Sequence, residues 1–90
     1  MDYEWDPKKA AKNVHKHNVS FEEAASVFND PLYVDFNDPN HSLDEHRYII
    51  IGVSTSGRLL LVSYTERETT IRLIGARDVT PAERTAYEEG

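Results

Sequence analysis

The order of helical and strand-like segments predicts an α+β fold, in which helices pack against an antiparallel sheet. Two capped helical segments lie near the N-terminus, and four segments with strand chemistry follow them. Three of those strands are joined by links short enough for hairpins, and a third capped helix closes the chain. With a short strand at the start, the predicted order is β-α-α-β-β-β-β-α, in a single domain of residues 1–90.

The first residues predict a short strand and a helix. Residues 2–5 alternate acidic and aromatic side chains, which suits a strand with one apolar face. Asp6 is a good N-cap and Pro7 is pre-set for the first helical position, so a helix is expected over 7–17. Asn18 is expected to end it, because asparagine tolerates the left-handed conformation that often follows a helix.

A second helix is predicted over 21–28. Ser20 and Glu23 have the spacing of a capping box, and the apolar residues that follow recur with a helical period. Residues 29–31, Asn-Asp-Pro, end this helix, and the short link between the two helices predicts an αα-hairpin. Three aromatic residues are assigned to the core: Trp5, Phe21 and Phe28.

The middle of the chain predicts the sheet. Residues 32–36 have strand chemistry, and an acidic, turn-rich loop follows over 37–45. The next three strands form an antiparallel meander, because only short links separate them: 46–53, 58–65 and 69–77. The last helix is expected over 81–89, where Thr80 and Glu83 have capping-box spacing.

The composition is that of one soluble globular domain, with 39% hydrophobic and 29% charged residues. The absence of cysteine excludes disulfides, thiolate metal sites and cysteine nucleophiles. No apolar run approaches the ~20 residues of a membrane span, and the first residues are too acidic for a signal peptide. A cytoplasmic protein is therefore expected.

Positive charge is divided between two parts of the chain. The net charge of −6 argues against binding nucleic acid through bulk electrostatics. Every lysine lies at or before position 16, and every arginine at or after position 47. Lys8, Lys12 and Lys16 recur at every fourth residue and form a basic stripe on the first helix. This division suggests different tasks for the two kinds of cation.

Several common kinds of site have little support. Neither a glycine-rich phosphate loop nor a Gly-x-Ser-x-Gly motif is present, and His15 and His17 point in different directions on their helix. His41 and His46 flank the acidic loop, where a solvated loop is the preferred reading over a weak divalent-ion site. Three carboxylates accompany them there: Asp38, Asp44 and Glu45. We expect no metal ion and no other cofactor.

Arginine within apolar strands is the remaining signal. Arg72 and Arg77 lie in one strand and Arg47 opens another, and an arginine buried without an anion is costly. Two readings stay open: a phosphate or oxyanion site, or structural ion pairs with Glu45, Glu66, Glu68 or Asp78. Because five positions separate Arg72 from Arg77, they share a face only if a bulge intervenes, and Gly75 is a suitable place for one.

An ordered series of residues along nearly the whole chain resembles the BrnT family of toxins. The series runs Tyr3-Glu-Trp5-Asp-Pro-Lys8, Asn13, Lys16-His17, Val19-Ser-Phe21-Glu-Glu-Ala24, Val27-Phe28-x-Asp30-Pro31, Glu45-x-Arg47, Gly52, Arg58-Leu-Leu, Thr65-Glu-Arg67, Arg72-Leu-Ile-x-Ala76-Arg77, Glu83-Arg84 and Tyr87. The chain departs from the family pattern at Asn18, where glycine is common, and at Gly75, where serine is common.

The resemblance implies a RelE-like fold and a toxin of a type II toxin–antitoxin system that cleaves RNA and arrests growth. It also implies a BrnA-type antitoxin, which neutralises the toxin in a hetero-oligomer and alone contacts operator DNA. The alternative is an inactive protein of the same fold that only binds a partner. The acidic charge and Gly75 favour this alternative, and the retained arginines favour the enzyme.

Metal-independent RNA cleavage requires a base, an acid and cations for the charge of the transition state. Arg77 is expected to stabilise that charge, with Arg72 as its partner. His17 is a candidate acid or base because histidine titrates near neutrality, although a half-buried structural histidine is the alternative. Lys8 is a candidate for phosphate binding or proton transfer, and its alternative is a place in a solvated helix stripe. Glu45 is a candidate base, and its alternative is a structural ion pair.

A second set of residues is expected to hold the RNA rather than to react with it: Arg67, Arg47, Lys12 and Tyr64. Tyr64 is the only aromatic member, and it could stack on a base. Its alternative is a place at the edge of the core, which is commoner for tyrosine in a strand.

Overall fold

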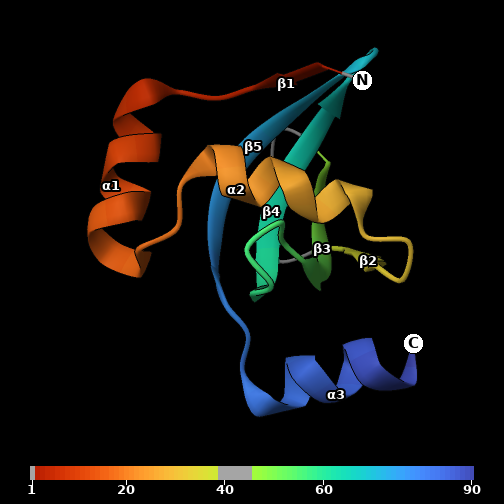
Figure 1. The fold of residues 1–90 in the computed structure, drawn as a ribbon. Coiled ribbons are helices and arrows are strands. Elements are labelled where there is room, and N and C mark those ends of the chain that lie inside the picture. The colour runs from red at the N-terminus through yellow and green to blue at the C-terminus, as the bar shows by residue number, and fades with distance from the viewer. Residues whose placement is uncertain (1, 39–45) are drawn as a thin grey trace.

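The computed structural model describes residues 2–38 and 46–90. In that part of the chain a five-stranded sheet, in the order β1-β5-β4-β3-β2, packs with helices α1, α2 and α3 as an α+β fold (Figure 1). The strands are β1 (Asp2–Glu4), β2 (Val34–Asn37), β3 (Arg47–Val53), β4 (Leu59–Arg67) and β5 (Thr70–Asp78). The helices are α1 (Pro7–His17), α2 (Phe21–Ser26), the 3-10 turn η1 (Val27–Asn29) and α3 (Pro81–Glu89).

The sheet is mixed, so the prediction of a wholly antiparallel sheet is wrong at one edge. Strands β2 to β5 form the expected antiparallel meander. Strand β1 instead runs parallel to β5, with Tyr3 opposite Ile71. A hairpin forces antiparallel pairing, but β1 is followed by two helices, so its direction is set by where the chain returns to the sheet.

Local capping fixes the ends of α1. The side chain of Asp6 accepts a hydrogen bond from the backbone N–H of Lys8 at 2.8 Å. At the other end Asn18 adopts the left-handed conformation, with a φ of 57°. Both residues therefore act as predicted.

The predicted capping box of the second helix is only half formed. The hydroxyl of Ser20 accepts from the backbone N–H of Glu23 at 3.0 Å. The carboxylate of Glu23 turns away from Ser20 and accepts hydrogen bonds from Ser54, at 2.7 Å, and from Ser56 and Arg58. This acid therefore ties α2 to the β3–β4 turn, because hydroxyl and guanidinium donors lie within its reach. Helix α2 ends at Ser26 and continues only as η1.

The core lies between α2 and one face of the sheet, which we call the core face. Phe21, Ala24 and Val27 are fully buried there, against Leu60 and Val62 of β4. Figure 1 shows α2 crossing this face. The predicted core aromatics are confirmed: Phe21 is part of the cluster, and Trp5 and Phe28 pack against it. None of the described helices is long and apolar enough to cross a membrane.

We call the opposite side of the sheet the outer face. Ile51 and Leu61 are buried on it but lie outside the main core cluster. Helix α3 packs against β3, and the hydroxyl of Tyr87 donates to Asp30 at 2.6 Å. The four arginines of interest belong to this face by alternation along their strands: Arg47, Arg67, Arg72 and Arg77.

Candidate active site

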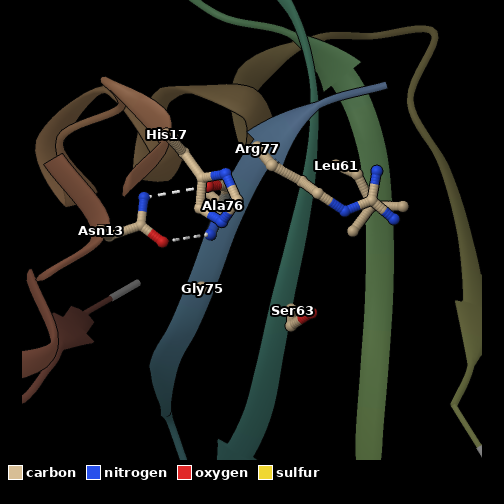
Figure 2. A pocket seen from close by; sticks show the side chains of 7 residues that line it. All are labelled: Asn13, His17, Leu61, Ser63, Gly75, Ala76 and Arg77. Carbon is tan, nitrogen blue, oxygen red and sulfur yellow. Dashed lines mark hydrogen bonds between the residues drawn. The ribbon is translucent and has the colours of Figure 1, made fainter. Parts of the chain in front are cut away.

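A pocket of about 170 Å³ lies where the last turns of α1 meet the C-terminal part of β5 (Figure 2). It is lined by Asn13, His17, Leu61, Ser63, Gly75, Ala76 and Arg77. Two predicted catalytic residues, His17 and Arg77, therefore line one pocket although they are far apart in the sequence. Helix α1 supplies the histidine, and the outer face of the sheet supplies the arginine.

A bulge in β5 sets the direction of the arginines. Ile74 is the extra residue of β5, since the pairs on either side of it are Ser63 with Gly75 and Tyr64 with Leu73. The side chains before and after the bulge that enter the core are Ile71, Leu73 and Ala76. Arg72 and Arg77 therefore lie on the same outer face. The bulge that a shared face requires is therefore present, at Ile74 and not at Gly75 itself.

Asn13 holds the pocket together by bonding to two distant backbone segments. Its side-chain Nδ2 donates to the carbonyl oxygens of Ala76 and Val19, each at 2.9 Å. Its Oδ1 accepts from the backbone N–H of Ala76 at 3.1 Å. Strand β1 pairs with β5 only over residues 70–72, so the Asn13 amide occupies the place of a neighbouring strand beside Ala76.

Sequence reasoning gave Asn13 no role. The available signal was its position one helical turn before His17, on the same side of α1. Ser63 was also missed, because its place in the pocket depends on its pairing with Gly75 across two strands.

The guanidinium of Arg77 is held by an acid of α3. Its Nη1 and Nη2 donate to the two carboxylate oxygens of Glu83 at 2.8 and 2.9 Å, and Nη1 also donates to the Asp78 carbonyl at 3.1 Å. Figure 2 shows the side chain extending over β4 toward Leu61, away from the ring of His17. The predicted acidic partners did not include Glu83, which the turn between β5 and α3 brings back onto Arg77.

This ion pair changes the titration of both groups. Hydrogen bonds from Arg77 are the main reason that the pKa of Glu83 falls to about 2, and those from Thr80 lower it further. The same pairing raises the pKa of Arg77. Glu83 also accepts from the backbone N–H of Thr80 at 2.8 Å, completing the capping box of α3. One carboxylate thus caps a helix and neutralises the pocket arginine.

Arg72 lies outside the pocket. Its Nη1 forms a 2.5 Å ion pair with Glu4 of β1. The strand register places it in one row with Thr65 and Arg47, across β5, β4 and β3. Thr65 is only 1% exposed, and its hydroxyl has no hydrogen-bond partner among residues 2–38 and 46–90. The row gathers two predicted cations at a distance from His17.

The other predicted residues are spread over the molecule. Lys8 lies in the first turn of α1, roughly 14 Å along the helix from His17, and does not line the pocket. Lys12 lines a neighbouring cavity. Arg67 pairs with Thr70 at the far end of β4. Glu45 lies outside the described residues.

Tyr64 belongs to the core face rather than to the pocket. Its ring lies 5.0 Å from Phe28 and 5.4 Å from Tyr48, between centroids, and only 4% of the residue is exposed. Burial raises the pKa of its hydroxyl well above the ordinary range. The structure therefore favours the core reading of Tyr64 over stacking on a base.

Asn37 and His46 lie at the two borders of the predicted acidic loop. His46 forms a 3.1 Å hydrogen bond with Asn37. Within the described parts of the chain, no three histidine or acidic side chains gather in a group that could hold a metal. The remaining candidates lie outside the described residues: His41, Asp44 and Glu45.

The fold and pocket define a small α+β protein in which a histidine of α1 and an arginine of β5 line one pocket. The chain belongs to the BrnT family, because the family model described as "Ribonuclease toxin, BrnT, of type II toxin-antitoxin system" matches residues 5–83. It is therefore a member of a family of ribonuclease toxins, whose systems pair each toxin with an antitoxin protein.

A solved structure shows the same fold. The chain is similar to the ribonuclease toxin BrnT of Brucella abortus, known from a 1.1 Å crystal structure, with a TM-score of 0.65. The two are 19% identical, and the alignment covers 89% of this chain and 97% of that one. A search of curated proteins gave no significant match.

Proposed function

We propose that this protein is a cytoplasmic endoribonuclease toxin with a RelE-like fold. It cleaves RNA without a metal ion, arrests growth, and is neutralised by a BrnA-type antitoxin that alone contacts operator DNA. The observation that supports this proposal is the pocket that His17 of α1 and Arg77 of β5 both line. Membership of the BrnT family supports the class of reaction.

The chemistry proposed for the pocket is attack of an RNA 2′-oxygen on the adjacent phosphorus. The 2′-hydroxyl proton passes to a base, the P–O5′ bond breaks, and the leaving 5′-oxygen takes up a proton. The products are a 2′,3′-cyclic phosphate and a 5′-hydroxyl. His17 carries protons in this scheme, and Arg77 stabilises the negative charge of the phosphorane.

Arg77 must exchange partners for this reaction. In the structure its two terminal nitrogens are bound by the Glu83 carboxylate and the Asp78 carbonyl. A phosphate presents the same pair of oxygens to an arginine as a carboxylate does. The scissile phosphate therefore takes the place of Glu83, and the 39% exposure of the Arg77 side chain gives it access.

The test is cleavage of a single-stranded RNA by purified protein in EDTA. We expect cleavage to persist and to leave cyclic phosphate ends, with His17→Ala and Arg77→Ala both slower. Loss of activity on chelation, restored by Mg²⁺ or Mn²⁺, would contradict the metal-independent mechanism. Induced expression with and without the antitoxin would measure growth arrest and its neutralisation.

The second candidate is an inactive protein that only binds its partner. The pairing of both Arg72 and Arg77 with carboxylates favours it, as does Gly75 in the pocket. A Cβ at Gly75 would meet only Asn13 Oδ1, at 3.8 Å, so a serine fits there. If the missing hydroxyl has silenced the site, Gly75→Ser should create cleavage that the natural chain lacks.

A further inference from the structure

Helix α1 carries a lysine surface that the proposed chemistry does not use. All the lysines of the chain lie on it, and it contains no acidic residue. Lys9, Lys12 and Lys16 have the i, i+3 and i+7 spacing of one helix face and are all exposed. No lysine forms an ion pair within the described parts of the chain, whereas Arg58, Arg72 and Arg77 are each bound to carboxylates.

The lysine face borders a second cavity, next to the pocket. This second cavity has a volume of about 230 Å³ and is lined by Lys9, Lys12, Asn13, Lys16, His17 and Ile74. It shares Asn13 and His17 with the pocket of Arg77. The two cavities therefore lie side by side around Asn13 and His17, and we call the one that the three lysines line the lysine groove. Ile74, the bulged residue of β5, gives the groove an apolar side.

The charge of the rest of the molecule directs an anion to this helix. Without its four lysines the chain has six arginines against sixteen acidic residues, a net charge of −10. A polyanion is therefore repelled by the molecule as a whole and attracted only where unpaired cations gather. The lysine groove meets that condition next to His17.

We propose that a single strand of RNA leaves the pocket along α1, and that Lys9, Lys12 and Lys16 bind the phosphates that flank the scissile one. This inference rests on the proposed function and names the subsite that holds its substrate. The three lysines span about 10 Å along the helix, which accommodates the backbone of a short strand. Lysine acts there as a point charge, so the groove binds backbone and does not select sequence.

The test is the salt dependence of RNA binding. The probe is a fluorescein-labelled, mixed-sequence 12-nucleotide RNA whose 2′-hydroxyls are all methylated, so that it cannot be cleaved. Anisotropy titrations from 50 to 200 mM salt would compare the wild type with Lys9→Gln, Lys12→Gln, Lys16→Gln and the triple variant. Arg84→Gln is the matched control, because Arg84 is exposed on α3 and its loss changes the charge equally.

Each lysine variant should lower the slope of log affinity against log salt by about 0.7, and the triple variant by about 2. Between 50 and 200 mM salt, the affinity of the triple variant should therefore fall by a factor about twenty times smaller than the factor for wild type. Arg84→Gln should keep the wild-type slope. A triple variant with the slope of Arg84→Gln would overturn the inference, as would lysine variants that weaken only the antitoxin complex.

A cleavage assay separates this inference from the proposed function. Lysine variants should raise KM and leave kcat unchanged, because phosphates beyond the reacting one bind equally in ground and transition states. If Arg77→Ala abolishes cleavage but the lysine variants keep the wild-type KM, only the lysine groove is wrong. If Arg77→Ala cleaves normally while the salt slopes change as expected, the groove stands and the proposed catalytic pocket fails.

Discussion

Helix α1 and the outer face of the sheet both present cations, and the two sets differ in their anionic partners. The α1 lysines meet no carboxylate in the described structure, whereas Arg72 and Arg77 are bound to Glu4 and Glu83. An unpaired surface lysine binds a polyanion without first releasing another anion, and this binding depends strongly on salt. A paired arginine is fixed in position and must exchange one anion for another. The comparison separates cations that attract RNA from cations that act on it.

The largest expected effect, which could break this comparison, is on Arg77. Arg77→Ala should slow cleavage by roughly 10²–10³-fold, the scale for losing one positioned donor to transition-state charge. Arg77→Lys should restore only part of the rate, because an ammonium cannot bind two phosphate oxygens as a planar fork does. Single-turnover cleavage and thermal melting would be measured together.

Glu83→Gln is the matched control for that experiment. It removes the ion pair but keeps an oxygen that can accept from the Thr80 N–H. If Arg77 acts on the substrate, Glu83→Gln should cleave at least as fast as wild type. The side chain that competes with the scissile phosphate for Arg77 then carries no charge. Equal losses of activity and melting temperature in Glu83→Gln and Arg77→Ala would mean that the arginine is only structural.

The next effect concerns Asn13, which joins the two regions. Asn13→Ala leaves the N–H and carbonyl of Ala76 and the carbonyl of Val19 without this partner, and should cost about 2–4 kcal/mol of stability. For a chain of this size that lowers the melting temperature by roughly 10–25 °C. His15→Ala, an exposed change on the same helix, is the control. An unchanged Asn13→Ala melting curve would remove Asn13 as the link between α1 and β5.

The smallest effect is the acid dependence of the Arg77–Glu83 pair, which sharpens the contrast with the unpaired lysines. The pKa of Glu83 is about 2 in the folded protein, below the 4.5 of an unperturbed glutamate. The pair therefore stabilises the fold fully above pH 4.5, and this stability is lost as the pH falls toward 2. Because the pair is partly exposed, the contribution is about 1 kcal/mol. Denaturant titrations at several pH values should show it in wild type but not in Glu83→Gln.

Local signals in the sequence located most of the elements. The caps at Asp6, Asn18 and Thr80 gave the limits of α1 and α3 as observed, and the predicted strands agree to within one or two residues at their ends. These signals are strong because a cap and the helix it starts are neighbours in the chain. Alternation along β5 likewise predicted that Arg72 and Arg77 share a face only with a bulge.

The candidate site was predicted in part. His17 and Arg77 were named from the sequence, and the structure places both at one pocket. Arg77 stood out as an arginine within an apolar strand, and the resemblance to the family led to roles for both residues. Neither signal could show that Lys8 and Tyr64 lie elsewhere. Lys8 is at the wrong end of α1, and Tyr64 alternates onto the core face of β4.

The sequence by itself determined the class of fold, the limits of α1 and α3, the family and the division between lysines and arginines. Only the tertiary structure decided the parallel pairing of β1, the Asn13 bridge, the choice of Glu83 as partner of Arg77, and the position of the lysine groove beside the pocket. The physical reason is the range of the interactions. Caps and periodicity act within a turn or two of the chain. Ion pairs and side-chain bridges depend on how distant segments pack.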